Sequence, residues 1–154
     1  DTQRSDQLII FQQIKNTIIT VKEGNKILLF HRLDSLEISK NRVINSYLSG
    51  LYSSQKTESK TLNSFVKYDQ KWLFIIDSSG IYHLPKFNPE TILLTQSPKI
   101  NLERLIQTLH PEQIIVDGSN YKSYTSRWEK TCKRKSVGFY NTSLKGAFVA
   151  TFSP

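Results

Sequence analysis

The strongest constraint on the fold is a series of three short, wholly apolar runs in the second half of the chain, at residues 72–76, 92–94 and 114–116. Runs of this length are typical of strands that are buried on both faces. Segments with helical spacing follow the second and third runs, so strands and helices alternate. This order predicts an α/β fold with a mixed β-sheet and crossover helices.

The helices of the second half are outlined by apolar positions and by capping residues. Asn101 is suited to cap a helix whose apolar positions fall at 102, 105, 106 and 109, and Pro111 ends it. A second helix is predicted over about 121–135. On its wheel, one stripe predicted to pack inward holds Tyr121, Tyr124, Trp128 and Cys132.

The first half is predicted to begin with a strand meander and to continue with one helix. We expect a helix over about 40–53 capped by Ser39, and a polar, mobile loop over 53–61. Strands are expected at 8–11, 17–21, 27–30, 65–68, 72–76, 81–82, 138–140 and 147–149, with turns at 23–26 and 69–70. We expect a single domain over 1–154, with strands in 1–33, a helix in 39–53 and a C-terminal half over 63–154.

Composition limits the class of protein further. The 154 residues suffice for one core, and the absence of Met together with Asp1 predicts a piece excised from a longer protein. No apolar run of about 18 residues occurs, so we expect no membrane insertion by this chain. Cys132 is the single cysteine, which excludes an intramolecular disulfide and a multi-cysteine zinc site.

Positive charge gathers near the C-terminus. The net charge is +8, and residues 121–145 hold seven Lys or Arg and one Glu. Opposite the aromatic stripe of the second helix, we predict an outward ridge that could contact nucleic-acid phosphates, made of Lys122, Arg127, Lys130, Lys133 and Arg134. The alternative is a solvated helix face without a partner.

The turn at 118–123 precedes this helix and offers a second candidate site. Its residues Ser119, Asn120 and Lys122 could help a helix N-terminus to bind a phosphate. Ordinary capping by Ser119 or Ser123 is the alternative, and the turn lacks the glycines of a P-loop.

Metal ligands are sparse. The three histidines, His31, His83 and His110, have no partner at ligand spacing. Asp77 and Asp117 each follow a buried strand, where α/β folds place ligand sites, but Asp is also a common turn residue. We interpret both as turn carboxylates and expect no metal and no cofactor.

The C-terminal half resembles a known family. The stretches 89–99, 109–120 and 139–149, with the Trp128 helix between the last two, are similar to the C-terminal region of ComEC-type DNA-uptake proteins in a Bacteroidota-like form. The resemblance covers about residues 65–154. It implies a degenerate metallo-β-lactamase-like fold, truncated to half of the sandwich, in a protein whose channel passes single-stranded DNA across the inner membrane during natural transformation.

The chain departs from that family where hydrolysis would need metal ligands. No H-x-H-x-D-H motif occurs, and residues 95–99, Thr-Gln-Ser-Pro-Lys, stand where a histidine-rich turn is expected. Residues 121–123 stand in place of a late histidine, and Asp77 falls near the metal-bridging Asp as a relic or a turn residue. The resemblance therefore implies a metallo-β-lactamase-like fold and a role in DNA uptake, whereas these departures argue against metal-dependent hydrolysis.

We therefore expect a non-catalytic, soluble module of an inner-membrane competence channel, on its periplasmic side. It would bind or guide single-stranded DNA or brace the rest of the channel, its expected partners. One alternative is a divergent metal-dependent phosphodiesterase that uses Asp77 and Asp117 with a histidine. Another is a purely structural domain.

Overall fold

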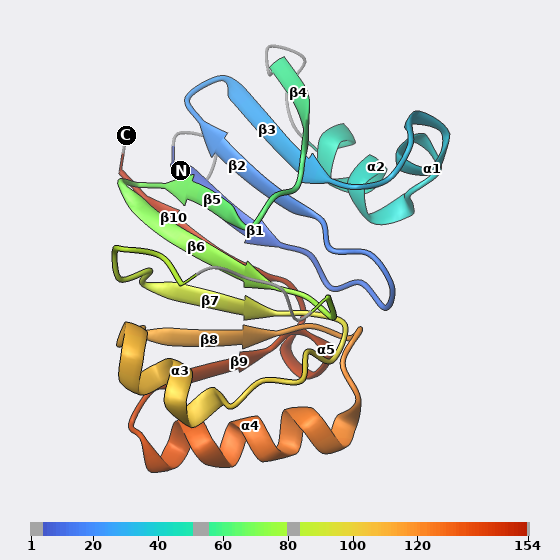
Figure 1. The fold of residues 1–154 in the computed structure, drawn as a ribbon. Coiled ribbons are helices and arrows are strands. Elements are labelled where there is room, and N and C mark those ends of the chain that lie inside the picture. The colour runs from blue at the N-terminus through green and yellow to red at the C-terminus, as the bar shows by residue number, and fades with distance from the viewer. Residues whose placement is uncertain (1–4, 51–55, 80–83, 154) are drawn as a thin grey trace.

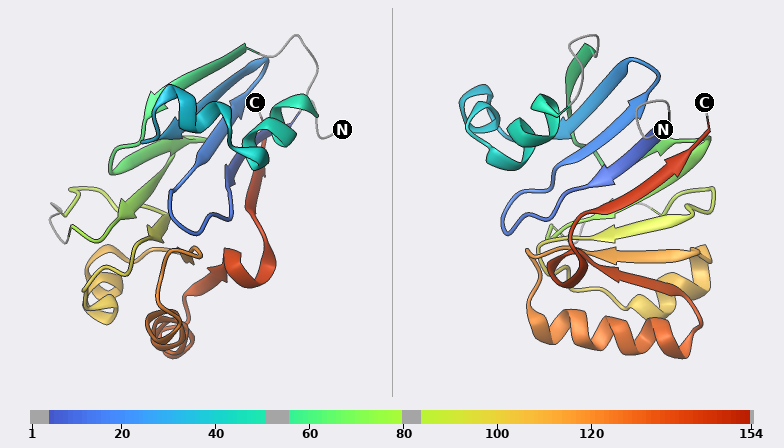
Figure 2. Two further views of the ribbon diagram at one scale, coloured as in Figure 1. Left: turned by 90° about the vertical axis from the view of Figure 1, so that its right-hand side faces the viewer. Right: turned by 180° about the vertical axis from the view of Figure 1, so that it is seen from behind.

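Two β-sheets stacked face to face form the centre of the molecule, and helices cover their outer faces (Figures 1 and 2). The computed structural model describes residues 5–50, 56–79 and 84–153. Its strands are β1 (Asp6–Ile10), β2 (Ile19–Glu23), β3 (Lys26–His31), β4 (Lys56–Thr61), β5 (Phe65–Tyr68), β6 (Lys71–Ile76), β7 (Thr91–Leu94), β8 (Gln113–Val116), β9 (Gly138–Asn141) and β10 (Phe148–Phe152). Its helices are α1 (Ser35–Ser39), α2 (Arg42–Ser49), α3 (Leu102–Leu109), α4 (Lys122–Arg134) and α5 (Thr142–Lys145).

Each sheet has five strands. The first has the order β10-β1-β2-β3-β4, antiparallel except for the parallel β3–β4 pair. The second has the order β5-β6-β7-β8-β9, in which β6 to β9 run parallel. The predicted mixed α/β architecture is confirmed. The structure adds that both sheets of a sandwich are present: β1 to β4 form the first sheet, and β10, from the end of the chain, joins it by pairing with β1.

The three apolar runs are buried on both faces, as predicted. In β6, Leu73 and Ile75 face the first sheet, whereas Phe74 and Ile76 face α3 and α4. The runs in β7 and β8 divide in the same way, with Leu93 and Ile115 between the sheets. A strand covered on both sides needs apolar residues at every position, which explains the unbroken runs.

Tight turns agree with the predicted hairpins. Gly24, with φ +62°, lies in the two-residue turn between β2 and β3. Asp69 and Gln70, with φ of +48° and +59°, form the turn between β5 and β6. Positive φ at both central residues matches the twist of a two-residue hairpin.

The predicted helix over 40–53 is wrong in its start and its cap. Asp34 caps α1 with a capping box that includes Glu37, and Asn41 caps α2 by accepting from the Ile44 amide. Ser39 is the last residue of α1 and donates its hydroxyl to the Leu36 carbonyl. Asn41 forms the better cap because its side chain reaches the third amide of the helix that follows it. Residues 51–53 lie outside the described residues.

The predicted loop over 53–61 is also wrong where the structure describes it. Residues 56–61 form β4, which pairs with β3 and is exposed at every position. Lys26, Glu58 and Lys60 form ion pairs there. Because β4 buries neither face, its sequence carries no hydrophobic period that could reveal a strand. The strand expected at 81–82 lies outside the described residues.

No helix in the described parts of the chain is long and apolar enough to cross a membrane.

Candidate functional site

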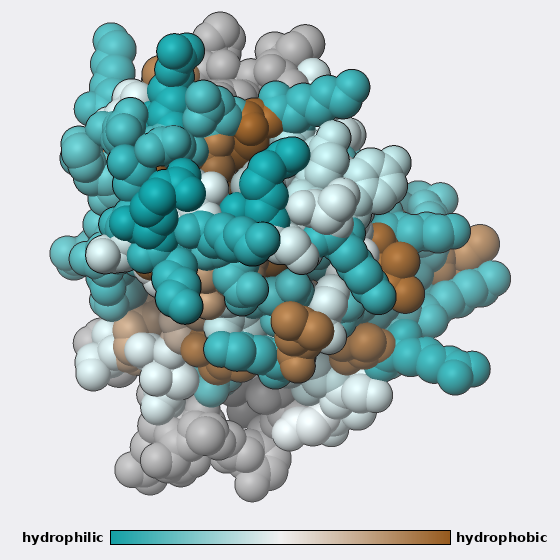
Figure 3. Space-filling model, turned by 90° about the horizontal axis from the view of Figure 1, so that it is seen from below, coloured by the Kyte–Doolittle hydropathy of each residue, from teal (hydrophilic) through white to brown (hydrophobic). Residues whose placement is uncertain are grey.

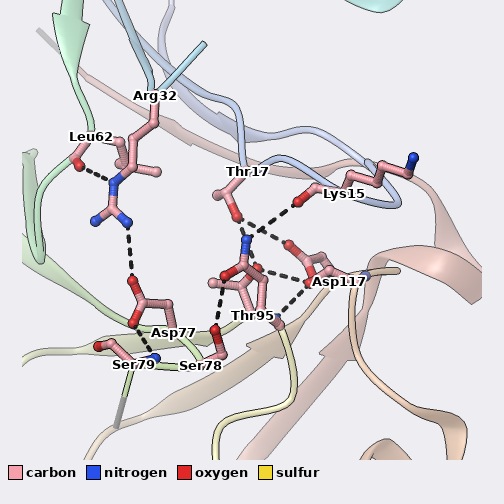
Figure 4. A network of polar contacts seen from close by, with 11 residues as sticks. Lys15, Thr17, Arg32, Leu62, Asp77, Ser78, Ser79, Thr95 and Asp117 are labelled. Atoms are coloured by element: carbon pink, nitrogen blue, oxygen red, sulfur yellow. Dashed lines mark hydrogen bonds and ion pairs between the residues drawn. The ribbon is translucent and has the colours of Figure 1, made fainter. Parts of the chain in front are cut away.

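A cluster of polar side chains lies at one edge of the sandwich, where parallel strands end (Figure 4). Asp77 follows β6, Thr95 follows β7 and Asp117 follows β8, and these strands run parallel, so their carboxyl ends meet. Thr17, from the loop between β1 and β2, and Arg32, which follows β3, reach the same edge from the first sheet. The sequence indicated the two carboxylates, but no local pattern marked Thr17 or Arg32.

Asp117 is the buried centre of this cluster, with 2% of its surface exposed. It accepts hydrogen bonds from the Ser119 hydroxyl, from the Ser119 amide at 3.1 Å and from Thr17 Oγ1 at 3.4 Å. Burial raises the pKa of the Asp117 carboxyl, and the hydrogen bonds from Ser119, Thr95 and Thr17 act against that rise. Through these hydrogen bonds, the Asp117 carboxyl connects the loops that follow β1, β7 and β8.

Asp77 lies in a different environment. Its carboxylate forms an ion pair with Arg32 at 3.0 Å and accepts from the Ser79 amide at 3.0 Å. Partial burial acts to raise the pKa of Asp77, but the hydrogen bonds from Ser79 and the charge of Arg32 outweigh it and hold that pKa below its ordinary value. Arg32 is fixed in turn by a 2.7 Å bond from Nε to the Leu62 carbonyl.

These donors do not fit a catalytic metal ion. Hydrolytic metal sites need about three protein ligands, and the described residues include no cluster of three or more His, Cys, Asp or Glu side chains that could hold one. The Arg32 guanidinium already pairs with Asp77, and Asp117 accepts hydrogen bonds from Thr17 and Ser119. His31 bonds to Ser59 and to the Leu33 amide, and His110 is the exposed C-cap of α3. His83 lies outside the described residues.

The polar groups of the turn after β8 form hydrogen bonds with other parts of the protein. The Ser119 hydroxyl accepts from the Gln96 amide at 2.7 Å, and Asn120 Oδ1 accepts from the Ser97 amide at 2.7 Å. The amides of Gly118, Ser119, Asn120 and Tyr121 all donate to neighbouring loops or to Asp117. Ser119 and Asn120 therefore connect this turn to the 95–97 loop, and neither is free to bind a phosphate in this conformation. Tyr121 is the N-cap of α4, without a side-chain cap bond.

Gly118 is closely packed in this turn. A Cβ there would meet the Gln12 side chain and would lie 3.0 Å from Ser143 Oγ. Gln12 cannot move freely, because it bonds to the Gly118 amide, to Thr142 and to Ser143. The close approach of three segments thus requires a residue without a side chain.

We predict that Gly118→Ala lowers the free energy of unfolding by about 1–3 kcal/mol, because it displaces Gln12 and leaves its partners unpaired. Urea denaturation measures the change. Gly50→Ala is the control, since a Cβ there makes only ordinary contacts at 3.5 Å. An equal effect at both positions would contradict the role assigned to Gly118.

The aromatic stripe of α4 packs partly as predicted. Trp128 and Cys132 are buried against the second sheet and α3, and Tyr124 is half-buried. Tyr121 differs from the prediction, because it is the N-cap that precedes the first turn of α4 and is 67% exposed. Its ring meets Tyr124 edge to face at 5.5 Å, and Arg127 lies 4.8 Å from the centre of the Tyr124 ring.

The basic ridge lies on the outer side of α4, where Figure 3 shows a largely hydrophilic surface seen from below. Lys122, Arg127, Lys130, Lys133 and Arg134 are all exposed. Arg134 lies 3.4 Å from Glu103 of α3, so its charge is partly neutralised. Among the described residues, Lys122, Lys130 and Lys133 have no ion-pair partner. Arg127 also has no ion-pair partner within the described part of the chain, but it lies over the Tyr124 ring, so the three lysines are the cations most available to an anionic partner.

Comparison with known proteins supports both the fold and the family. No curated protein matches the chain. A solved structure that is similar is the metallo-β-lactamase fold protein YhfI from Bacillus subtilis, with a TM-score of 0.54 and 8% identity over 96% of this chain and all of that one. The chain therefore has the metallo-β-lactamase fold. The family model of the ComEC C-terminal domain matches residues 8–152. Since this match spans both sheets and nearly the whole sequence, the chain belongs to the ComEC C-terminal domain family.

Proposed function

We propose that this domain is a non-catalytic module that binds or guides single-stranded DNA along the outer face of α4. Family membership makes the chain a module of a competence protein for DNA uptake. The periplasmic side of the inner membrane and contacts with the rest of the channel are parts of the same proposal, which rest on the family alone.

The observation that carries the proposal is the row of exposed lysines on α4. Lys122, Lys130 and Lys133 project from one rigid helix, and the ends of the row lie roughly 16 Å apart at 1.5 Å rise per residue. Glu129 is the one carboxylate that the helix itself carries. Such a row can follow a phosphate backbone without reading its sequence.

The exposed Tyr121 at the start of α4, with the half-buried Tyr124 beside it, supports a single strand over a duplex as the ligand. Tyr121 presents much of its ring to solvent next to Lys122, and Arg127 lies over Tyr124. Unpaired bases stack on such rings, and cations beside them hold the backbone. In the part of the chain that the structure describes, the side chains around Asp77 and Asp117 do not form a fitting ligand set, which supports the non-catalytic part of the proposal.

Lys130→Glu combined with Lys133→Glu is expected to weaken binding to single-stranded DNA by at least about tenfold at low salt, because two attractive contacts become repulsive. Fluorescence anisotropy with a labelled oligonucleotide measures the affinity. The control is Lys40→Glu with Lys56→Glu, which changes the net charge equally at exposed positions on α1's C-cap and on β4. An equal loss of DNA affinity in both double variants would show that net charge alone explains the effect. Unchanged affinity in the Lys130/Lys133 variant would show that α4 does not bind DNA.

A further inference from the structure

A second surface, at the polar edge of the sandwich, combines exposed apolar side chains with lysines. Two segments form this loop edge: residues 12–17, between β1 and β2, and residues 141–146, which include α5. Ile14 is 74% exposed and Leu144 is 78% exposed, and these are the largest exposed fractions among the large hydrophobic residues of the described chain.

The two segments lie side by side although they are far apart in the sequence. Gln12 Nε2 donates to Ser143 Oγ at 3.4 Å, and Thr142 donates to Gln12 Oε1. Ile14 lies two residues from Gln12, and Leu144 directly follows Ser143. The hydrogen bonds therefore hold the two segments that carry these exposed side chains at one edge of the sandwich, toward the right of Figure 1, next to the Ile10–Phe148 end of the β1–β10 pair.

The charge of the loop edge is wholly positive. Lys15 and Lys145 are exposed beside the two apolar residues, and neither segment contains Asp or Glu. Of the nearby carboxylates, Asp117 is buried and Asp77 is paired with Arg32. Figure 4 shows the Lys15 side chain directed away from the polar cluster, and Figure 3 shows hydrophobic residues among hydrophilic ones along its right-hand margin.

We infer that the loop edge docks on an anionic phospholipid surface, with Ile14 and Leu144 entering the interface and Lys15 and Lys145 contacting the headgroups. An anionic membrane offers a partner to both kinds of side chain: acyl chains contact the apolar residues, and lipid phosphates contact the lysines next to them. A nucleic acid would match the lysines but would leave isoleucine and leucine side chains without a partner. The inference is independent of DNA binding by α4, because it uses different residues.

Flotation of the chain with lipid vesicles tests the inference. We expect binding to vesicles of phosphatidylcholine with about one-third phosphatidylglycerol and little binding to phosphatidylcholine alone, because anionic lipids attract each nearby lysine. Ile14→Ser with Leu144→Ser should weaken binding by about tenfold or more. Lys15→Gln with Lys145→Gln should weaken it by about fivefold for each lysine.

Two controls separate the membrane from other partners. Leu36→Ser with Val43→Ser removes exposed apolar residues from α1 and α2, where Asp34 and Glu37 balance Lys40 and Arg42 so that no excess positive charge is present, and should leave vesicle binding unchanged. The Ile14/Leu144 variant should keep its affinity for single-stranded DNA. The inference is overturned if wild type does not float with anionic vesicles, if both apolar pairs matter equally, or if the Ile14/Leu144 variant loses DNA and vesicle binding together. In that last case, the loop edge belongs to the nucleic-acid surface.

Discussion

Replacing Trp128 by alanine is expected to lower the free energy of unfolding by about 3–5 kcal/mol, a large part of the 5–15 kcal/mol that is usual for a domain. Trp128 is 1% exposed and joins α4 to the second sheet, where it packs in one cluster with Phe74, Ile76 and Leu105. Its removal leaves a cavity beneath the helix that carries the basic ridge. Urea denaturation followed by far-UV circular dichroism measures the loss.

Trp128→Phe is the matched variant. Within the described residues, the buried Nε1 of Trp128 has no hydrogen-bond partner. Phenylalanine keeps most of the apolar contact and removes this unpaired donor, so the expected loss is below about 1.5 kcal/mol. A loss as large as that of the alanine variant would show that the indole nitrogen has a partner that the packing does not reveal.

Asp117→Ala is expected to lower the free energy of unfolding by about 2–3 kcal/mol, because the donors on Ser119 and Thr17 would lose their buried acceptor. Asp77→Ala should cost about 1 kcal/mol or less, since the Asp77–Arg32 pair is partly exposed to solvent. Chemical denaturation of both variants at neutral pH gives the comparison. A larger loss for Asp77 would reverse the roles assigned to the two carboxylates.

The two carboxylates should also respond to pH in opposite directions. The pKa of Asp117 is raised on folding, so the pH-dependent part of its contribution to stability is complete below the unfolded pKa and is lost as the pH rises through the folded pKa. The hydrogen bonds that its carboxylate accepts from Ser119 and Thr17 remain at neutral pH. The pKa of Asp77 is lowered, so its contribution is present above the unfolded pKa and is lost as the pH falls through the folded pKa. As the pH falls from about 7 to about 4, wild type should therefore gain stability relative to Asp117→Asn, and below about pH 4 it should lose stability relative to Asp77→Asn.

Elements with a buried face could be predicted from the sequence, and exposed elements could not. The apolar runs in β6, β7 and β8 and the capped helix α3 are confirmed, because burial imposes a pattern on them. The sequence predicts a loop at β4, because this strand buries neither face and is held by backbone pairing and polar contacts with β3. The place of β10 in the first sheet depends on its pairing with β1, which joins opposite ends of the chain and leaves no local signal.

The carboxylates of the candidate site could be predicted from the sequence, but their hydrogen-bond partners could not. The rule that ligands gather at the carboxyl ends of parallel strands pointed to Asp77 and Asp117, which the structure places at the same edge. Their partners Thr17 and Arg32 come from the first sheet, and their positions depend on how the two sheets stack. The hydrogen-bonding roles of Ser119 and Asn120 depend on the 95–97 loop, which is distant in sequence.

The central claim, that the domain holds single-stranded DNA without cutting it, is tested most directly by a salt titration of DNA binding in the presence of Mn²⁺, followed by sizing of the recovered strand. With three lysine contacts, the logarithm of affinity should fall with the logarithm of salt with a slope of about −2, so that a fourfold rise in salt weakens binding about twentyfold. The strand should be recovered at full length. Salt-independent binding, no binding, or shortening of the strand with stoichiometric metal bound to the protein would contradict the claim.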